Sequence, residues 1–136
     1  MQIVPDYPCE CGLSNAHGSE TAASGQIDNR IINGIETQPN EYPWQVALVR
    51  QAGHTPFCGG SVISNRHILT AAHCTQDIDY VSQVEVLVGE HDLMTVNDEC
   101  QRYRLSRILE HPKYNDQTVA FDFSILVLSE ALHFSR

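Results

Sequence analysis

Two short stretches place a histidine and an aspartate in settings that suit acid–base chemistry. His73 ends the apolar run "LTAAHC" beside Cys74, and Asp122 stands at the head of the apolar run "FDFSILVL". A general base must be held rigidly, which a disulfide at Cys74 would do. A carboxylate flanked by Phe121 and Phe123 is shielded and needs a partner, such as an imidazole N–H. The pair suggests two members of a catalytic triad, with His73 as base and Asp122 orienting it.

The other histidines have no such setting. We expect them to be structural or to face solvent: His17, His54, His67, His91, His111 and His133.

Composition restricts the class of protein. The 136 residues suffice for one ordinary domain, and 42% hydrophobic with 18% charged residues is typical of a globular chain. The net charge of −9, from 17 acidic and 8 basic residues, argues against nucleic-acid binding and against anionic membranes. No apolar run approaches the roughly 18 residues that a membrane-spanning helix needs.

The cysteines favour disulfides over a metal site. They are Cys9, Cys11, Cys58, Cys74 and Cys100. A zinc site would use "CEC" with a distant pair, or His67 with His73, and neither has the usual ligand spacing. A disulfide framework implies an oxidising compartment, although "MQIVPDYPCECG" has no signal-peptide features. We therefore expect that the natural N-terminus precedes this sequence, and the odd cysteine count suggests a partner beyond the C-terminal end.

The elements that must position the pair are short strands. Residues 13–29 are small and polar, as in a linker, and the composition changes at Arg30. Strand-like runs with polar turns occur at 44–50, 56–64, 67–70, 84–89, 102–109 and 123–128. This pattern predicts an all-β barrel or sandwich. "TAAHC" can form a helical turn with Thr70 as its N-cap.

Two runs have features of their own. In 102–109, Tyr103 and Leu105 are predicted to point inward, with a bulge near Ser106 where the alternation slips. The run 123–128 is continuously apolar and predicts a strand buried on both faces.

"LTAAHC" and "DFSILVL" resemble the histidine and aspartate motifs of the chymotrypsin/trypsin family of serine peptidases. Further motifs occur in the family's order, covering about residues 31–136: "RIING", "PWQVAL", "CGGSVIS", "VGEHD" and "HPKYN". The segment from Cys9 to Arg30, which begins "CECGLSN", resembles the light chains of secreted arthropod trypsin-like zymogens. The resemblance implies a light-chain or propeptide segment at 1–30 and the N-terminal half of a peptidase domain at 31–136.

For the fold, the resemblance implies the N-terminal six-stranded antiparallel β-barrel of a chymotrypsin-like two-barrel fold, with the second barrel absent from this chain. The family's nucleophilic serine stands in a "GDSGG" context in that second barrel, and this sequence has no such motif. Ser61 lies in a segment that the family uses structurally and Ser124 lies inside a strand, so neither is expected to be the nucleophile.

For function, the resemblance implies a secreted serine endopeptidase made as a zymogen, of which this chain is a fragment. His73 would take the proton of the missing serine, and Asp122 would orient His73. Partners would be a protein or peptide substrate, an upstream activating protease and protease inhibitors, in an extracellular location. The alternative is a non-catalytic serine-protease homologue, or a truncated product that acts as a binding or decoy module.

Cleavage and cross-linking sites are implied by the same resemblance. "RIING" implies activation by cleavage between Arg30 and Ile31, after a polar segment that proteolysis requires. Cys58 and Cys74 flank the strands that carry the histidine turn, and we expect them to form a disulfide. Cys9 or Cys11 is expected to pair with a cysteine beyond Arg136, which leaves Cys100 ambiguous.

The acidic loop that ends at Cys100 corresponds to one that binds calcium in some family members. Glu90 and Asp92 could supply oxygen ligands, but Cys100 stands where an acid is expected. The alternative is a solvated acidic turn, and no other cofactor is expected. We also expect residues 1–136 alone to be inactive and poorly soluble, because an apolar face would be exposed around the histidine turn and the Asp122 strand.

Overall fold

The computed structural model describes residues 12–15, 37–89 and 100–134. Among these residues, no helix has both the length and the apolar character that a membrane crossing needs.

The chain divides into two compact units between Pro43 and Trp44. In the first unit, the backbone N–H of Asn15 donates to the carbonyl of Glu41 at 2.9 Å, and its side-chain amide donates to the carbonyl of Asn40 at 2.9 Å. These bonds join two described segments that are distant in sequence. The strands described below belong to the second unit.

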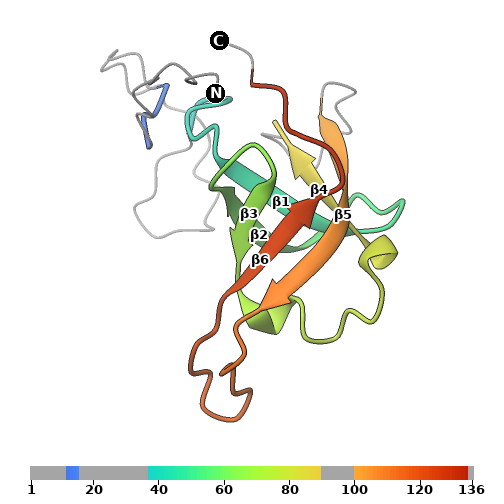
Figure 1. The fold of residues 1–136 in the computed structure, drawn as a ribbon. Coiled ribbons are helices and arrows are strands. Elements are labelled where there is room, and N and C mark those ends of the chain that lie inside the picture. The colour runs from blue at the N-terminus through green and yellow to red at the C-terminus, as the bar shows by residue number, and fades with distance from the viewer. Residues whose placement is uncertain (1–11, 16–36, 90–99, 135–136) are drawn as a thin grey trace, which may run out of the picture. The chain divides into compact units, whose positions relative to one another are not determined.

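The second unit is a closed antiparallel barrel with the strand order β1-β2-β3-β6-β5-β4 (Figure 1). The strands are β1 Gln45–Arg50, β2 Pro56–Val62, β3 His67–Thr70, β4 Val84–Val88, β5 Gln101–Glu110 and β6 Ser124–Leu128. Two short 3-10 turns, η1 Ala72–Cys74 and η2 Val81–Gln83, lie between β3 and β4. The predicted all-β, six-stranded antiparallel barrel is confirmed. The division at residue 30 and the second barrel stay predictions.

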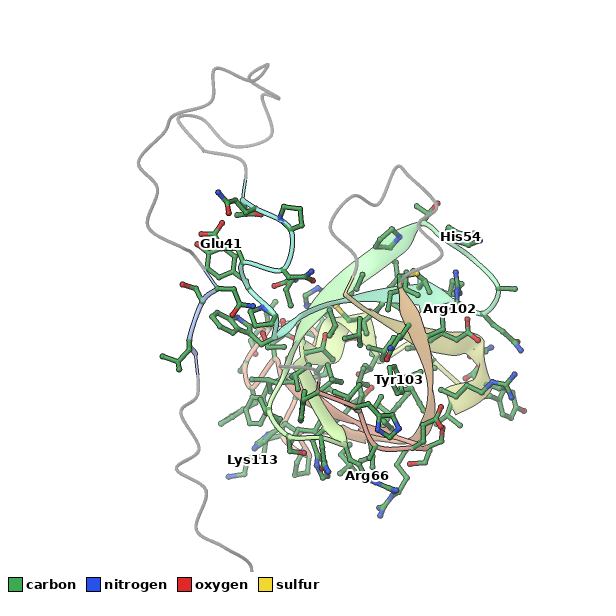
Figure 2. All side chains as sticks on the ribbon, turned by 90° about the horizontal axis from the view of Figure 1, so that it is seen from above. Glu41, His54, Arg66, Arg102, Tyr103 and Lys113 are labelled. Carbon is green, nitrogen blue, oxygen red and sulfur yellow. A yellow bond between two sulfur atoms is a disulfide. The ribbon has the colours of Figure 1, made fainter. Side chains whose placement is uncertain are left out.

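The barrel interior holds the core. Leu48, Ile68 and Leu126 are fully inaccessible to solvent, and Tyr103 points into the same cluster, as Figure 2 shows. Burying an aliphatic side chain of this size contributes about 1.5–3 kcal/mol. The strands around the site are therefore held by packing inside the barrel.

Strand β5 carries the bulge that its sequence predicts. Leu105 pairs with Leu128 and Arg107 pairs with Val127, so Ser106 is an extra residue on β5. Its hydroxyl donates to the carbonyl of Val127 at 3.1 Å, which satisfies the side chain on the barrel wall. Because of the bulge, the side chains on both sides of the extra residue still alternate between the inside and the outside of the barrel.

The prediction that the run 123–128 is buried on both faces is wrong. In β6, Ser124, Leu126 and Leu128 are buried, whereas Ile125 and Val127 are only half-buried. The reason is the single-layered barrel wall, which has one inner face and one outer face, whereas two-sided burial requires a layer on each side of the sheet.

The prediction that Thr70 caps the histidine turn is also wrong. Strand β3 extends through Thr70, which pairs with Ser124, and the N-cap of η1 is Ala71 without a side-chain hydrogen bond. The Thr70 hydroxyl instead donates to the carbonyl of Gly59 at 2.8 Å. Barrel pairing therefore overrides the local capping preference.

Candidate active site

Strand pairing brings His73 and Asp122 to one end of the barrel. β3 and β6 are antiparallel neighbours, and Thr70 at the end of β3 pairs with Ser124 at the start of β6. His73 lies in the turn η1 just after β3, and Asp122 lies just before β6. Figure 1 shows η1 beside the point where β6 begins.

The two side chains make a direct contact. His73 Nδ1 lies 2.7 Å from Asp122 Oδ2, and the backbone N–H of His73 donates to Asp122 Oδ1 at 2.8 Å. An ionised carboxylate only accepts hydrogen bonds, so Nδ1 carries the proton and Nε2 of the neutral ring is an acceptor. The His73 side chain is 56% exposed and that of Asp122 is 20% exposed, so the base faces solvent while its partner is shielded.

This contact changes the acidity of the carboxyl group. The side-chain hydrogen bond from His73 is the main cause that lowers the pKa of Asp122 below its ordinary value, followed by the backbone N–H of His73. Partial desolvation opposes them. The lowered pKa keeps Asp122 an anion throughout the neutral pH range. Burial, and then the negative charge of Asp122, raises the pKa of Tyr114.

A disulfide anchors the histidine turn. Cys58 on β2 and Cys74 on η1 are bonded, with their Cα atoms 6.2 Å apart, which confirms the predicted bridge. The sulfur of Cys74 lies 3.6 Å from His73 Nε2. The donor atoms of Cys58, His73 and Cys74 all lie within 4.8 Å of one another, but the disulfide occupies both sulfurs. In its oxidised form this cluster therefore offers a metal no thiolates.

A second contact that holds the histidine turn in place was not predicted from the sequence. Thr75 is buried, and its hydroxyl lies 2.8 Å from Oε1 of Glu110 at the end of β5 and 3.1 Å from the carbonyl of Ala72. A hydroxyl has one proton to donate, and the charged carboxylate makes the shorter bond. A threonine after "AHC" has no pattern that would predict this bond to another strand.

The aromatic residues on either side of Asp122 form a cluster with His111. Both Phe121 and Phe123 are exposed, and His111 stacks on Phe121 with ring centroids 4.8 Å apart. The His111 ring is also 4.6 Å from that of Phe123, and Lys113 Nζ lies 5.9 Å from the Phe121 centroid. Phe121 has a φ of 57°, in the left-handed region that disfavours bulky residues. The carboxylate itself is held by the histidine turn, through the ring and the backbone N–H of His73.

A further cluster joins the β1–β2 turn to β4 and β5, the two strands that follow β1 around the closed barrel. Arg102 donates to Glu85 Oε2 at 2.8 Å, to the carbonyl of Gly53 at 2.7 Å and to His54 Nδ1 at 3.0 Å. Figure 2 shows His54 and Arg102 side by side. This ionic anchor was not predicted, because its members are distant in sequence.

Several predicted site residues lie outside the described part of the chain. They are Arg30 and Ile31 of the activation site, Glu90 and Asp92 of the calcium loop, and the cysteines Cys9 and Cys11. Their roles stay predictions, as do the pairing of Cys100 and the catalytic roles of His73 and Asp122.

Known proteins are similar to this chain in sequence. The family model described as "Trypsin" matches residues 31–136. "Transmembrane protease serine 9" of Rattus norvegicus is 35% identical over 128 residues, covering 94% of this chain and 11% of that protein. "Venom serine protease" of Polistes dominula is 33% identical over 131 residues, covering 93% of this chain and 42% of that protein. The chain thus spans less than half the length of either relative.

Proposed function

The chain belongs to the trypsin family, and from this membership we propose that it supplies the general base of a serine endopeptidase. The single observation that carries the proposal is the 2.7 Å contact between His73 Nδ1 and Asp122 Oδ2. The substrate would be a protein or peptide, the class on which serine proteases act.

In this mechanism, borrowed from the family, Asp122 holds the proton on Nδ1 and leaves Nε2 unprotonated. Nε2 accepts the proton of the serine hydroxyl as the serine attacks the peptide carbonyl, and later returns it to the leaving amine. The Asp122 carboxylate stabilises the imidazolium that forms between these steps. The exposed His73 ring is open to a nucleophile that approaches from outside the barrel.

The serine is proposed to come from a part of the protein outside these residues. Ser124 is fully buried, and Ser61 is held in the barrel wall opposite Leu69. The relatives are much longer than the matched segment, which leaves room for such a part. The second barrel would also carry the oxyanion donors and the specificity pocket.

The remaining proposals concern how the complete protein is made and controlled. We propose an extracellular zymogen, activated by an upstream protease at the bond between Arg30 and Ile31 and restrained by protease inhibitors. The disulfide between Cys58 and Cys74 supports an oxidising compartment. Treating the complete protein with a trypsin-like activator tests the cleavage, and a new N-terminus other than Ile-Ile-Asn-Gly would contradict it.

The experiment that tests the function is peptidase turnover of the complete, activated protein and of its His73→Ala variant. Loss of a triad member costs several orders of magnitude in kcat in this family. His67→Ala is the matched control, because His67 lies on the same strand–turn segment and bonds Ser64 rather than Asp122. Near-normal turnover in His73→Ala would refute the proposal. An inactive wild-type protein that lacks the serine motif would favour a non-catalytic homologue or decoy.

A further inference from the structure

A sulfur atom lies on the side of the His73 ring that faces away from Asp122. Nδ1 contacts the Asp122 carboxylate at 2.7 Å, and Nε2 lies 3.6 Å from the sulfur of Cys74. A carboxylate, an imidazole and a sulfur are therefore in contact, one after the other. In the oxidised chain this sulfur is bonded to Cys58 and has no ionisable proton.

We propose that the Cys58–Cys74 disulfide masks a Cys–His–Asp relay, and that its reduction exposes Cys74 as a nucleophilic thiolate paired with His73. The partners of this site would be soft electrophiles, namely alkylating carbon centres and the disulfides of small thiols. The relay needs only the geometry of these side chains, so it stands whether or not the complete protein cleaves peptides.

The chemistry requires a reductant, which here is a small dithiol. The dithiol gives up two electrons and two protons and becomes a cyclic disulfide, while the Cys58–Cys74 bond breaks and yields two thiols. The proton of Cys74 then moves to His73 Nε2, which leaves a thiolate beside an imidazolium. On reaction with iodoacetamide, the sulfur forms a bond to carbon and iodide leaves with the electron pair of the broken carbon–iodine bond.

The two cysteines of the bridge are not equivalent. Cys58 lies on β2 and packs against the hydrophobic core cluster, where an ionised sulfur is disfavoured. Cys74 lies on η1, within 3.6 Å of an imidazole nitrogen that can supply a positive charge. The reactivity is therefore assigned to Cys74 and not to Cys58.

Asp122 acts here as a positioning residue. Its two hydrogen bonds from His73 fix the ring so that Nε2 faces the sulfur, and its charge stabilises the imidazolium. Replacement of Asp122 should leave Cys74 in place but return its reactivity toward that of an ordinary thiol.

The test is site-resolved alkylation of the 136-residue chain, reduced with a dithiol in native buffer that contains a metal chelator. Iodoacetamide is added at about pH 6, and peptide mass spectrometry monitors Cys58 and Cys74 separately. An ordinary thiol is almost entirely protonated at this pH, whereas one paired with an imidazolium is ionised but intrinsically weaker as a nucleophile. We expect a net rate for Cys74 about tenfold above that of Cys58, and about tenfold above that of Cys74 in urea.

Variants distinguish a Cys74 thiol that His73 activates from a Cys74 thiol that reduction merely exposes. Cys58→Ser leaves Cys74 as a thiol without any reductant, and far-ultraviolet circular dichroism checks that this variant keeps its strands. In His73→Ala the Cys74 rate should fall about tenfold at about pH 6 and rise only near about pH 8.5, as for an isolated thiol. Asp122→Asn should shift the pH profile in the same direction, whereas His67→Ala should match the wild type.

Three results would overturn the relay. The first is a Cys74 rate that is unchanged in His73→Ala, and the second is equal reactivity of both cysteines in the mildly acidic buffer. The third is loss of the folded barrel in both the reduced wild type and Cys58→Ser, because the proposed pair must exist in the folded, reduced chain.

Discussion

Asp122 contacts His73 through both of its carboxylate oxygens, one bonded to the ring and the other to the backbone. Oδ2 lies 2.7 Å from Nδ1, and Oδ1 accepts the His73 backbone N–H at 2.8 Å. The carboxylate therefore fixes both the position of the histidine turn and the tautomer of its ring. An amide in its place could satisfy only one of these contacts with an oxygen.

The first prediction concerns Asp122→Asn. The amide oxygen should keep the backbone bond, which turns its NH₂ group toward Nδ1 and favours the tautomer with the proton on Nε2. In the complete protein we expect kcat to fall by about 10⁴, the cost of this replacement in the established triad. Nitrogen NMR of this chain should show the tautomer change directly. An unchanged tautomer together with full activity would contradict the assigned orientation.

The second prediction concerns the titration of Asp122. Because folding lowers its pKa, the stabilisation by its carboxylate is complete above about pH 4 and is lost as the pH falls through the lowered pKa. Carboxyl-carbon NMR should find its pKa below that of an ordinary aspartate. His73→Ala removes the main cause but keeps the backbone N–H, so the pKa should rise part of the way back. A pKa that does not move would show that the ring bond is absent in solution.

The third prediction concerns the β1–β2 turn. Ala52 is exposed and has a φ of 56°, a conformation that costs an alanine about 1 kcal/mol or more. Ala52→Gly should therefore raise the free energy of unfolding by about 1 kcal/mol in urea denaturation. Ala131 has no positive φ, so Ala131→Gly should leave stability unchanged or lower it. Equal effects at the two positions would argue against strain at Ala52.

The fourth prediction concerns the disulfide. Cys58 and Cys74 are 16 residues apart, and closing a loop of that length contributes about 3 kcal/mol. Replacing both with alanine should lower the free energy of unfolding by about this amount under oxidising conditions. Under reducing conditions the wild type loses the same cross-link, so the difference should largely vanish. A difference that persists in reductant would point to packing rather than loop closure.

The fifth prediction concerns the outer face of the barrel. Leu69 and Leu109 flank Ile125 in register, and each leucine is 40% exposed. Together they form an apolar row across β3, β6 and β5. Leu69→Lys with Leu109→Lys should reduce self-association of the isolated chain in size-exclusion chromatography. Leu13→Lys, at an exposed leucine in the other unit, is the control and should have a smaller effect.

Much of the barrel was predictable because apolar and polar residues alternate along its strands, just as successive side chains point to opposite faces of the barrel wall. The slip at Ser106 was visible in the same alternation, and the bulge lies there. These barrel features depend on local pattern, which one sequence records directly. The contact between His73 and Asp122 joins residues far apart in the chain, and it was predictable because the motifs around both residues resemble those of one peptidase family.

Other features depend on pairing across the barrel and were not predictable. The bond between Thr75 and Glu110, and the contacts of Arg102 with Glu85, join residues far apart in the chain. The length of β3 through Thr70 is fixed by its neighbour β6, which overrides the local preference for a cap. The left-handed backbone at Phe121 likewise comes from the path of its loop, since phenylalanine does not favour it.

The position of β6 at the end of the strand order in the sequence determines when the site can form during synthesis on the ribosome. β6 is the last of the six strands to be synthesised, and it closes the barrel by pairing with both β3 and β5. A nascent chain that has completed η1 holds His73 but no Asp122 for it to contact. The base can therefore be oriented only once the closing strand has emerged, so a chain released before β6 would lack both a closed wall and an oriented imidazole.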